Sequence, residues 1–364
     1  MKRKALMAAL AGGAVLATAA TALGATDGAG ATFPRIAYQT WCQDSNLCSY
    51  TGIGSTGGIN NFINGTVDFG ASDAPLRPDQ VSDLASKRGG VNVLYFPTLV
   101  GAVTVPTNFS GQSKRIQLTG STIGKIFAGS ISNWNDPQIK KENPGVSFPN
   151  APITTCVRSD GSGTSYQFSL FLSKASSDFK SKVGASQLPA WSAPNVIKSN
   201  GNPGVATCVS NNTNSIGYVD LADAQNAGLT DKMAAVGKSE VVGVKKKVHG
   251  KTRTVLVRRT AYVLPSVASM SAAGNVKASK FPANLQVDLT LSPVPRAYPI
   301  TSTTWILAYS DFAKAGKSGS LAGVKSVLNY FYSSAAQAKL PSMGYAPLPK
   351  PLLALAKSRV AALK

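Results

Sequence analysis

The chain of 364 residues is 43% hydrophobic and carries 37 Lys and Arg against 16 Asp and Glu, a formal net charge of +21. This apolar content excludes a disordered chain, and the length is sufficient for two domains that each bury a core. The positive charge favours contact with anionic surfaces. No zinc-finger, basic-zipper or aromatic-rich basic pattern accompanies it, so we expect no nucleic-acid binding.

The first 25 residues have the pattern of a secretory signal peptide. Residues 2–4 are basic, residues 5–16 are apolar, and residues 20–22 offer a small-residue cleavage site, with Ala25 as an alternative. The apolar run is short and rich in Ala and Gly for a membrane anchor, and no cysteine lies near the cleavage site to accept a lipid. We therefore expect an exported protein, periplasmic or secreted, that is soluble after removal of residues 1–25.

Predicted helices and strands alternate along the rest of the chain. In order, they are a helix over 33–41, a strand over 49–53, a helix over 57–64, a strand over 66–69, a helix over 78–87, strands over 91–95, 101–106 and 116–118, a helix over 123–127, a strand over 153–157, a helix over 166–172, a strand over 300–309, and helices over 321–332 and within 347–364. Thr32 and Pro34 are expected to cap the first of these helices. The alternation predicts an α/β architecture with mainly parallel sheets.

Residues 240–263 differ from the rest of the chain in composition. Two β-branched runs, 241–244 and 254–257, bracket the Lys-rich segment 245–251, a pattern that predicts a β-hairpin with a charged tip. The Gly-Lys-Thr at 250–252 is not a phosphate loop, because position 245 is Lys where that motif requires Gly. Burying the Lys and Arg side chains of this segment without partners would be costly. We therefore expect the hairpin at the periphery of the protein and outside any ligand pocket.

Four cysteines in an exported chain predict two disulfides. Three pairings are possible, and we prefer Cys42–Cys48, which closes a short loop, with Cys156–Cys208 as a long-range link. No Cys-x-x-Cys spacing is present, and the single histidine, His249, lies in a basic and polar stretch. We therefore expect no metal site and no cofactor.

Three segments mix Gly with Ser or Thr just before predicted helices: residues 30–34, 54–58 and 158–165. In this arrangement, backbone N–H groups and hydroxyls at helix starts can converge on an oxyanion. A fourth segment, residues 68–76, adds two carboxylates, which would repel a fully ionised anion. A ligand that carries its own proton would account for one of them. The sequence thus predicts a site for partly protonated phosphate.

A series of motifs follows one order along the chain. They are GAGATFP (28–34), GIGS (52–55), TVDFGASDAPL (66–76), DGSGTS (160–165), SIGYV (215–219) and PITSTT (299–304). Together they resemble the phosphate-binding protein of the bacterial ABC phosphate importer, across most of residues 28–235 and 297–350. One Gly-Ser run alone would be a weak signal, whereas the ordered series is specific. The hairpin at about 240–260 is not part of the resemblance.

The resemblance implies a two-lobed periplasmic solute-binding protein fold of type II, with the ligand cleft between the lobes. One lobe would comprise residues 26–99 plus 300–364, and the other residues 100–299, with the basic hairpin inserted at about 240–260. It also implies a monomer that is not an enzyme. Such a protein binds inorganic phosphate with high affinity and delivers it to an ABC permease in the inner membrane.

The resemblance also assigns phosphate contacts to a set of residues. They are Thr32, Phe33 (through its backbone N–H), Ser55, Asp73, Arg158, Ser162, Gly163 (through its backbone N–H) and Thr164, with Asp160 bracing Arg158.

The chemistry of these residues agrees with the assignment. Hydroxyls and N–H groups donate, and Arg158 offers planar, charge-assisted donors. Asp73 can only accept when ionised, so it favours a ligand P–OH over sulfate. Each also has a structural alternative: helix capping for the hydroxyls, a turn for Asp73 and a surface ion pair for Arg158.

Two other functions remain compatible with parts of the sequence. Hydrolysis is disfavoured because Ser162 lies in Gly-Ser-Gly rather than in a nucleophile elbow, and the single histidine is far away in the chain. A secreted phosphate scavenger or a polyanion-binding surface protein without a transport role would share the same site motifs. The sequence does not separate phosphate from arsenate as the ligand.

Overall fold

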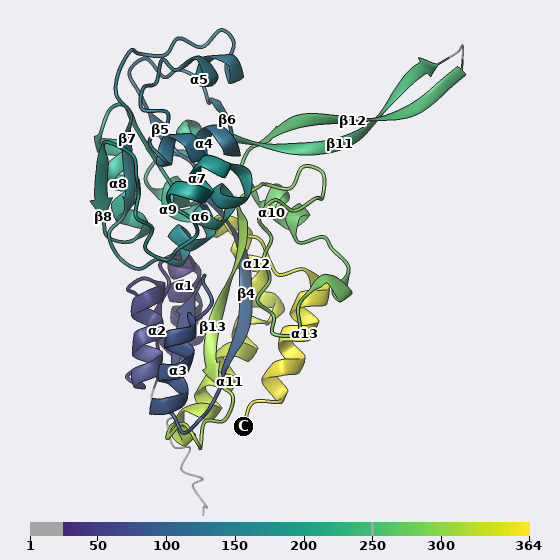
Figure 1. The fold of residues 1–364 in the computed structure, drawn as a ribbon. Helices are drawn as coiled ribbons and strands as arrows, with labels where there is room; N and C mark the ends of the chain where they lie inside the picture. Colours follow the sequence, from purple (N-terminus) through teal and green to yellow (C-terminus); the bar gives the residue numbers. More distant parts are fainter. Residues whose placement is uncertain (1–24, 249–250) are drawn as a thin grey trace, which may run out of the picture.

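Two long strands, β4 (Val93–Thr104) and β13 (Thr301–Tyr309), run side by side and connect the lower and upper parts of the molecule (Figure 1). The computed structural model describes residues 25–248 and 251–364. The predicted signal peptide (apart from Ala25) and His249 lie outside these residues. Every residue of β13 is buried, as expected for a central strand covered on both faces.

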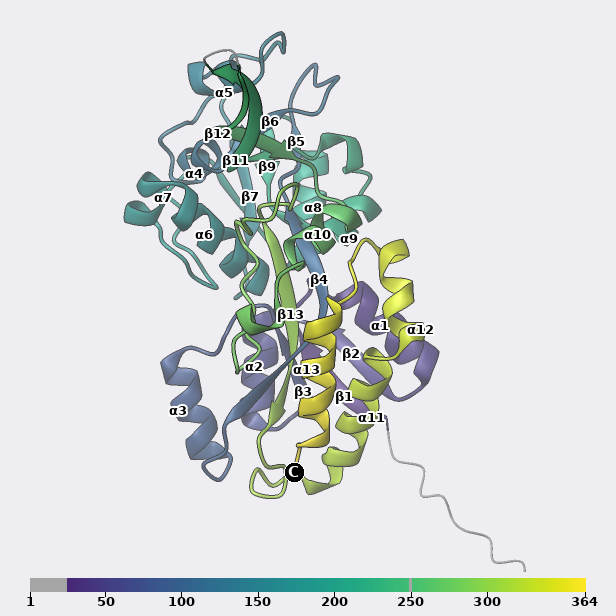
Figure 2. The ribbon, with the colours of Figure 1, turned by 90° about the vertical axis from the view of Figure 1, so that its right-hand side faces the viewer.

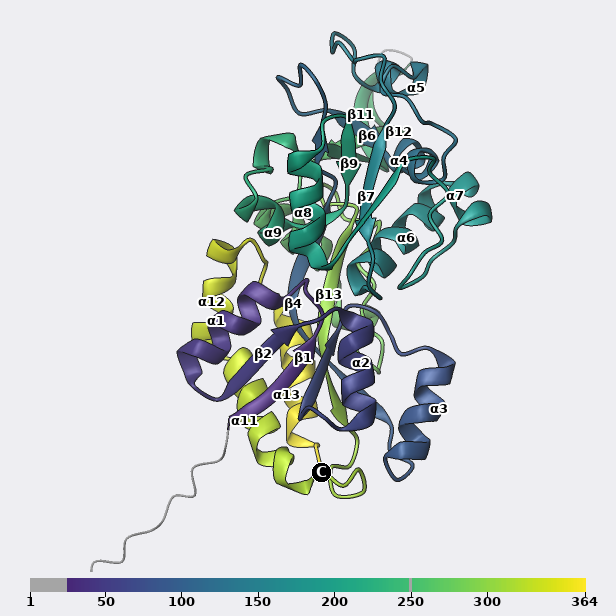
Figure 3. The ribbon, with the colours of Figure 1, turned by 90° about the vertical axis from the view of Figure 1, so that its left-hand side faces the viewer.

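The lower part is built on a six-stranded sheet in the order β10-β4-β13-β3-β1-β2. Its elements, in addition to β4 and β13, are β1 (Thr26–Gly30), α1 (Arg35–Ser45), β2 (Cys48–Gly52), α2 (Ser55–Asn64), β3 (Phe69–Ser72), α3 (Pro78–Lys87), β10 (Val219–Asp220), α11 (Leu321–Phe331), α12 (Ser334–Lys339) and α13 (Lys350–Ala361). Helices α2 and α3 cover one face, and α1, α11 and α13 cover the other (Figures 2 and 3).

The upper part contains a four-stranded sheet, β5-β9-β7-β8, and a three-stranded sheet, β12-β11-β6. Its elements are β5 (Thr107–Asn108), β6 (Gln117–Thr119), α4 (Gly120–Phe127), α5 (Pro137–Glu142), β7 (Thr154–Arg158), α6 (Gly163–Ala175), α7 (Ser177–Lys182), β8 (Val196–Ser199), α8 (Gly201–Asn211), β9 (Ser215–Gly217), α9 (Leu221–Asn226), β11 (Ala235–Val248), β12 (Lys251–Val263) and α10 (Val267–Ala273). Helices α6 and α7 lie on one side of β7, and α8 and α9 on the other (Figure 3).

The α/β class is confirmed, but the expectation of mainly parallel sheets is wrong. Strand β1 pairs parallel with β2 and β3, whereas β13 pairs antiparallel with both β3 and β4. The six-stranded sheet is mixed because β13 runs antiparallel to both of its neighbours. The four-stranded sheet is also mixed, since β5 pairs antiparallel with β9 whereas β7 pairs parallel with β8 and β9.

Three local predictions also need correction. The β runs at 91–95 and 101–106 form one continuous strand, β4. The strand expected over 66–69 begins only at Phe69; Asp68 precedes it and bonds Asp27 through both its backbone N–H (2.8 Å) and its side chain (2.9 Å). Thr32 does not cap α1, whose N-cap is Pro34 without a side-chain bond.

Both preferred disulfides are present. Cys42–Cys48 joins α1 to β2, and Cys156–Cys208 joins β7 to α8 across 52 residues of sequence. The pairing predicted from the spacing is therefore confirmed.

The predicted hairpin is confirmed and is longer than expected. Strands β11 and β12 pair antiparallel from Val236–Val263 outward, as a ribbon that projects from the upper part (Figure 1). At its base, β11 also pairs with β6, and Lys238 donates to the backbone oxygens of Ser292 (3.0 Å) and Val294 (2.6 Å). Within residues 25–248 and 251–364, no helix has the length and apolarity that a membrane span requires.

Candidate functional site

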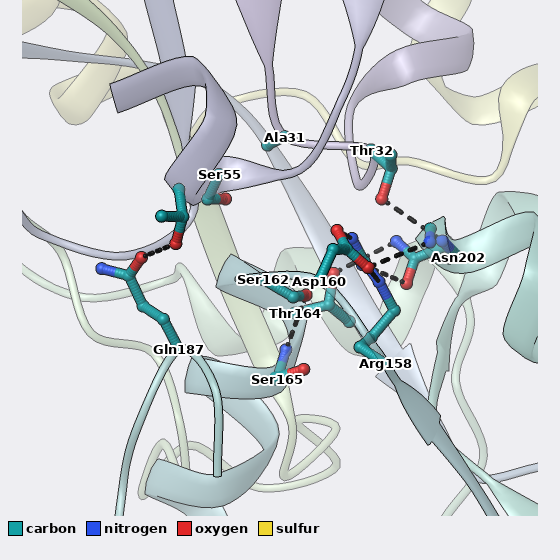
Figure 4. A network of polar contacts seen from close by, with 12 residues as sticks. Ala31, Thr32, Ser55, Arg158, Asp160, Ser162, Thr164, Ser165, Gln187 and Asn202 are labelled. Atoms are coloured by element: carbon teal, nitrogen blue, oxygen red, sulfur yellow. Dashed lines mark hydrogen bonds and ion pairs between the residues drawn. The ribbon is translucent and has the colours of Figure 1, made fainter. Parts of the chain in front are cut away.

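The segments singled out from the sequence converge where the lower and upper parts meet (Figure 4). The β1–α1 loop and the start of α2 come from the lower part, and the β7–α6 turn comes from the upper part. Direct contacts join them: the Thr56 N–H donates to the Gly161 oxygen (3.1 Å), and Thr56 Oγ1 donates to Gln187 Oε1 (2.6 Å). The sequence motifs therefore form one cluster in space.

The side chains assigned to phosphate contacts are all withdrawn from solvent. Exposure is 5% for Thr32, 2% for Arg158, 1% for Asp73, and 0% for Phe33, Ser55, Ser162 and Thr164. Burying this many polar groups is costly unless each finds a partner.

Asp73 follows β3 and is held by two hydroxyls. Thr304 Oγ1 donates to its Oδ1 (2.6 Å), and Ser55 Oγ lies 3.5 Å from its Oδ2 while accepting the Asp73 N–H (3.2 Å). Burial raises the pKa of Asp73 to about 7, although the Thr304 bond, the Arg158 charge and the Ser55 bond each lower it. The carboxylate is therefore set to accept a proton, or a ligand's hydroxyl, near neutral pH.

Glycine allows the two halves of the site to approach closely. A Cβ on Gly163 would lie 2.5 Å from Ser55 Oγ and 2.6 Å from Asp73 Oδ2. Gly54 adopts φ +85°, and a Cβ there would lie 2.3 Å from Asp160 Oδ2. The starts of α2 and α6 can thus face each other only without side chains at these positions, and both helix dipoles then favour an anion between them.

Arg158 ends β7 and is paired within the site. Its Nε donates to Asp160 Oδ1 (2.7 Å), its second terminal nitrogen donates to Asp160 Oδ2, and the first donates to Asn202 Oδ1 (3.2 Å). Burial would raise the pKa of Asp160, but the Arg158 hydrogen bonds and charge outweigh it, and the pKa lies below its usual value. Asp160 therefore stays ionised, and its charge offsets that of Arg158.

The hydroxyls at the start of α6 accept hydrogen bonds and keep a proton to donate. Ser162 Oγ caps α6 by accepting the Ser165 N–H (3.1 Å), and Thr164 Oγ1 accepts from Asn202 Nδ2 (3.1 Å). Across the junction, Thr32 Oγ1 accepts the Asn202 N–H (3.3 Å; Figure 4). Capping and ligand binding are thus compatible roles for the same side chains.

Phe33 and Gly163 were assigned through their backbone N–H groups. The Phe33 ring is fully buried, and its carbonyl accepts from the Tyr345 hydroxyl (2.7 Å). Gly163 is the first residue of α6, the position at which N–H groups point out of the helix.

Sequence reasoning missed three amides that organise the site. Asn202 contacts Thr32, Arg158 and Thr164. Gln167 Nε2 donates to the Asp73 backbone oxygen (2.6 Å), and Gln187 Nε2 to the Pro75 oxygen (3.2 Å). The Asn200-Gly201 pair is typical of a turn before a helix, but nothing in the local sequence marks its neighbour Asn202 as a contact of the site.

The arrangement fits a small oxyanion that carries a proton. Helix starts, hydroxyls and a guanidinium supply hydrogen-bond donors. The charge of Asp160 is offset by its ion pair with Arg158, so Asp73 is the acceptor that remains among these donors. Two α/β parts linked by crossing strands, with a buried anion site where they meet, define a two-lobed solute-binding protein.

Comparison with known proteins agrees with this class. The PBP superfamily domain matches residues 13–335. A phosphate-binding protein PstS of Xylella fastidiosa is 32% identical over 334 residues, 90% of this chain and 82% of that protein. The PstS of Haemophilus influenzae is 32% identical over 342 residues, 91% of each chain. This chain belongs to the PstS family of phosphate-binding proteins.

Solved structures agree in fold. The structure of a high-affinity periplasmic phosphate-binding protein, PfluDING, bound with phosphate at pH 8.5, matches with a TM-score of 0.68 at 22% identity, over 92% of this chain and 93% of that one. At this level of identity, the similarity concerns the architecture.

Proposed function

We propose that this protein binds inorganic phosphate with high affinity between its two parts and delivers it to an ABC permease in the membrane. The observation that carries the proposal is Asp73, a buried acceptor with a raised pKa among groups that donate. Such a site suits an anion that brings its own proton. The PstS names of relatives at 32% identity support the same ligand.

The proposed phosphate contacts are those assigned from the sequence. They are Thr32, Ser55, Asp73, Arg158, Ser162 and Thr164 through side chains, and Phe33 and Gly163 through N–H groups. Asp160 and Asn202 are positioning residues in this proposal, because each holds the Arg158 guanidinium.

Titration calorimetry of phosphate-stripped protein with phosphate, arsenate and sulfate tests the proposal. We expect tight binding of phosphate, similar binding of the near-isosteric arsenate, and weaker binding of sulfate at pH 9, where Asp73 is ionised. Equal affinity for sulfate and phosphate would contradict it. Turnover of an aryl phosphate would point to a hydrolase instead.

We also propose that residues 26–99 plus 300–364 and residues 100–299 form the two lobes, with a hinge where β4 and β13 cross between them. The separate sheets of the lower and upper parts, which β4 and β13 connect, support this division. Side-chain contacts cross the junction between the parts. Thr56 bonds Gln187, Asn202 bonds Thr32, and Arg35 forms an ion pair with Asp223 (2.7 Å). The first two lie at the proposed phosphate site. Away from it, residues 284–285 also contact the lower part, where Trp305 and Arg359 donate to their backbone oxygens.

The hinge predicts a change of shape on binding. Small-angle scattering should give a smaller radius of gyration with phosphate than without it, because phosphate bonds groups on both lobes. Sulfate at the same concentration is the control and should leave the radius unchanged. An identical radius in all three states would mean that the cleft is preformed or that the lobes are divided elsewhere.

A further inference from the structure

The feature that the phosphate site leaves unexplained is the outer part of the β11–β12 ribbon, residues 241–248 and 251–259, here called the arm. It projects beyond the body in Figure 1. Pairing with β6 ends at Gly237, so each arm strand has the other as its only described neighbour in the sheet. Eight extended residues reach about 26 Å. An isolated two-stranded ribbon is marginally stable in water, which makes a long exposed one unusual.

The charge of the arm has one sign. Its described cations are Lys245, Lys246, Lys247, Arg253, Arg258 and Arg259, all of them exposed. No acidic residue lies between positions 241 and 259. The nearest acid, Glu240, is used at the base, where it accepts the Arg296 N–H (3.1 Å) and lies 3.4 Å from Lys238 Nζ. The arm therefore carries a concentrated positive charge that nothing in it balances.

Exposed aliphatic side chains lie among these cations. Leu256 is 73% exposed, Val241 55% and Val244 38%. Gly243 lies opposite Leu256 and has no side chain to cover it. Val241 lies opposite Arg258, and this pair is on the same face of the ribbon as Leu256. A soluble polyanion would pair with the cations but leave these apolar groups in water, whereas the interface of an anionic bilayer accepts both.

We propose that the arm binds the surface of a bilayer rich in anionic lipid and so holds the binding protein beside a membrane. This interaction is separate from phosphate binding, because the arm contributes none of the residues of the site. Each Lys or Arg close to such a surface strengthens binding roughly five-fold. The attraction falls off over about 8 Å at physiological salt, so cations on the projecting arm count more than those on the body.

Sedimentation with vesicles tests the proposal, using the full mature chain. Wild type should bind vesicles of phosphatidylcholine mixed with phosphatidylglycerol, and not vesicles of phosphatidylcholine alone. Replacing Lys245, Lys246 and Lys247 by Gln should weaken binding by about 100-fold. The matched control replaces three exposed lysines of the body, Lys114, Lys180 and Lys357, by Gln and removes the same net charge. It should weaken binding only a few-fold.

A second variant separates a lipid surface from a soluble polyanion. Leu256→Asn with Val241→Asn removes apolar groups and no charge, so it should weaken vesicle binding and leave retention on heparin unchanged. Equal loss in the arm and body lysine variants would overturn the proposal, since net charge alone would then explain binding. Vesicle binding that is unaffected by Leu256→Asn with Val241→Asn would also overturn it and would favour a polyanion. Phosphate titration of the same variants should give wild-type affinity in every case.

Discussion

Asp73→Asn should admit sulfate to the site. In wild type at pH 9, where a carboxyl with a pKa of about 7 is ionised, a phosphate P–OH can donate to Asp73, whereas sulfate presents only acceptors to a buried carboxylate. Sites that require one hydrogen-bonding group can reject an analogue without it by about 10⁴-fold or more. Asparagine offers an NH₂ donor and removes the charge, so at pH 9 the ratio of phosphate to sulfate affinity should narrow by up to about 100-fold, chiefly through tighter sulfate binding, since protonating a group two pH units above its pKa costs about 100-fold. Parallel titrations of wild type and variant measure this ratio.

The same residue predicts a pH dependence. The pKa of Asp73 is raised to about 7, so above that pH the carboxylate only accepts, and below it the protonated group can donate. Sulfate binding to wild type should therefore strengthen as the pH falls through about 7, and Asp73→Asn should lose this dependence.

Asp68→Asn is the matched control for both experiments. Asp68 belongs to the same motif but accepts from the Asp27 N–H and pairs with Lys317 (3.1 Å), among groups that are not part of the site. Its replacement should leave selectivity and its pH dependence unchanged. An equal ratio of phosphate to sulfate affinity in wild type and Asp73→Asn would show that a group other than Asp73 determines which anion binds.

Arg158→Ala should weaken phosphate, arsenate and sulfate together. A guanidinium interacts with the negative charge of an anion and does not depend on whether the anion carries a proton. Its loss should therefore leave the ratio of phosphate to sulfate affinity unchanged. Truncating one partner of a buried, hydrogen-bonded charge pair costs about 2–5 kcal/mol, which corresponds to roughly thirty-fold to several thousand-fold in each affinity. The anion affinities of Arg158→Lys should lie between those of wild type and Arg158→Ala, because lysine keeps the positive charge but lacks the planar guanidinium that donates two hydrogen bonds side by side.

The free energy of unfolding provides the control for this effect. In Arg158→Ala, Asp160 loses its partner while its side chain is only 20% exposed, so the protein should be destabilised. Removing Asp160 as well, in Arg158→Ala/Asp160→Ala, should restore part of the stability without restoring anion affinity. Thermal unfolding measures the stability of each variant, and titration calorimetry measures its anion affinity. If Arg158→Ala weakened the binding of phosphate but not of arsenate and sulfate, the proposed role of Arg158 in binding the charge of the anion would be contradicted.

Local sequence pattern was sufficient for much of this protein. Helix α3 spans Pro78–Lys87 as predicted, because proline at its start and an amphipathic repeat are local signals. The hairpin and both disulfides likewise followed from β-branched runs and cysteine spacing. The Gly-Ser-Thr segments before helices were also readable, since the groups that favour an anion belong to the same few residues.

Tertiary structure decided the features that depend on distant partners. The direction of β13 against β3 and β4 depends on how the chain returns after about 200 residues, which no local pattern encodes. Thr32 reads as a helix cap, yet it accepts from Asn202, 170 positions away. Asp73 is held by Thr304, 231 positions away, and its raised pKa comes from burial that only the assembled fold provides. The residue types of the anion site were therefore fixed locally, while their hydrogen-bond partners and the ionisation of the site were set by long-range packing.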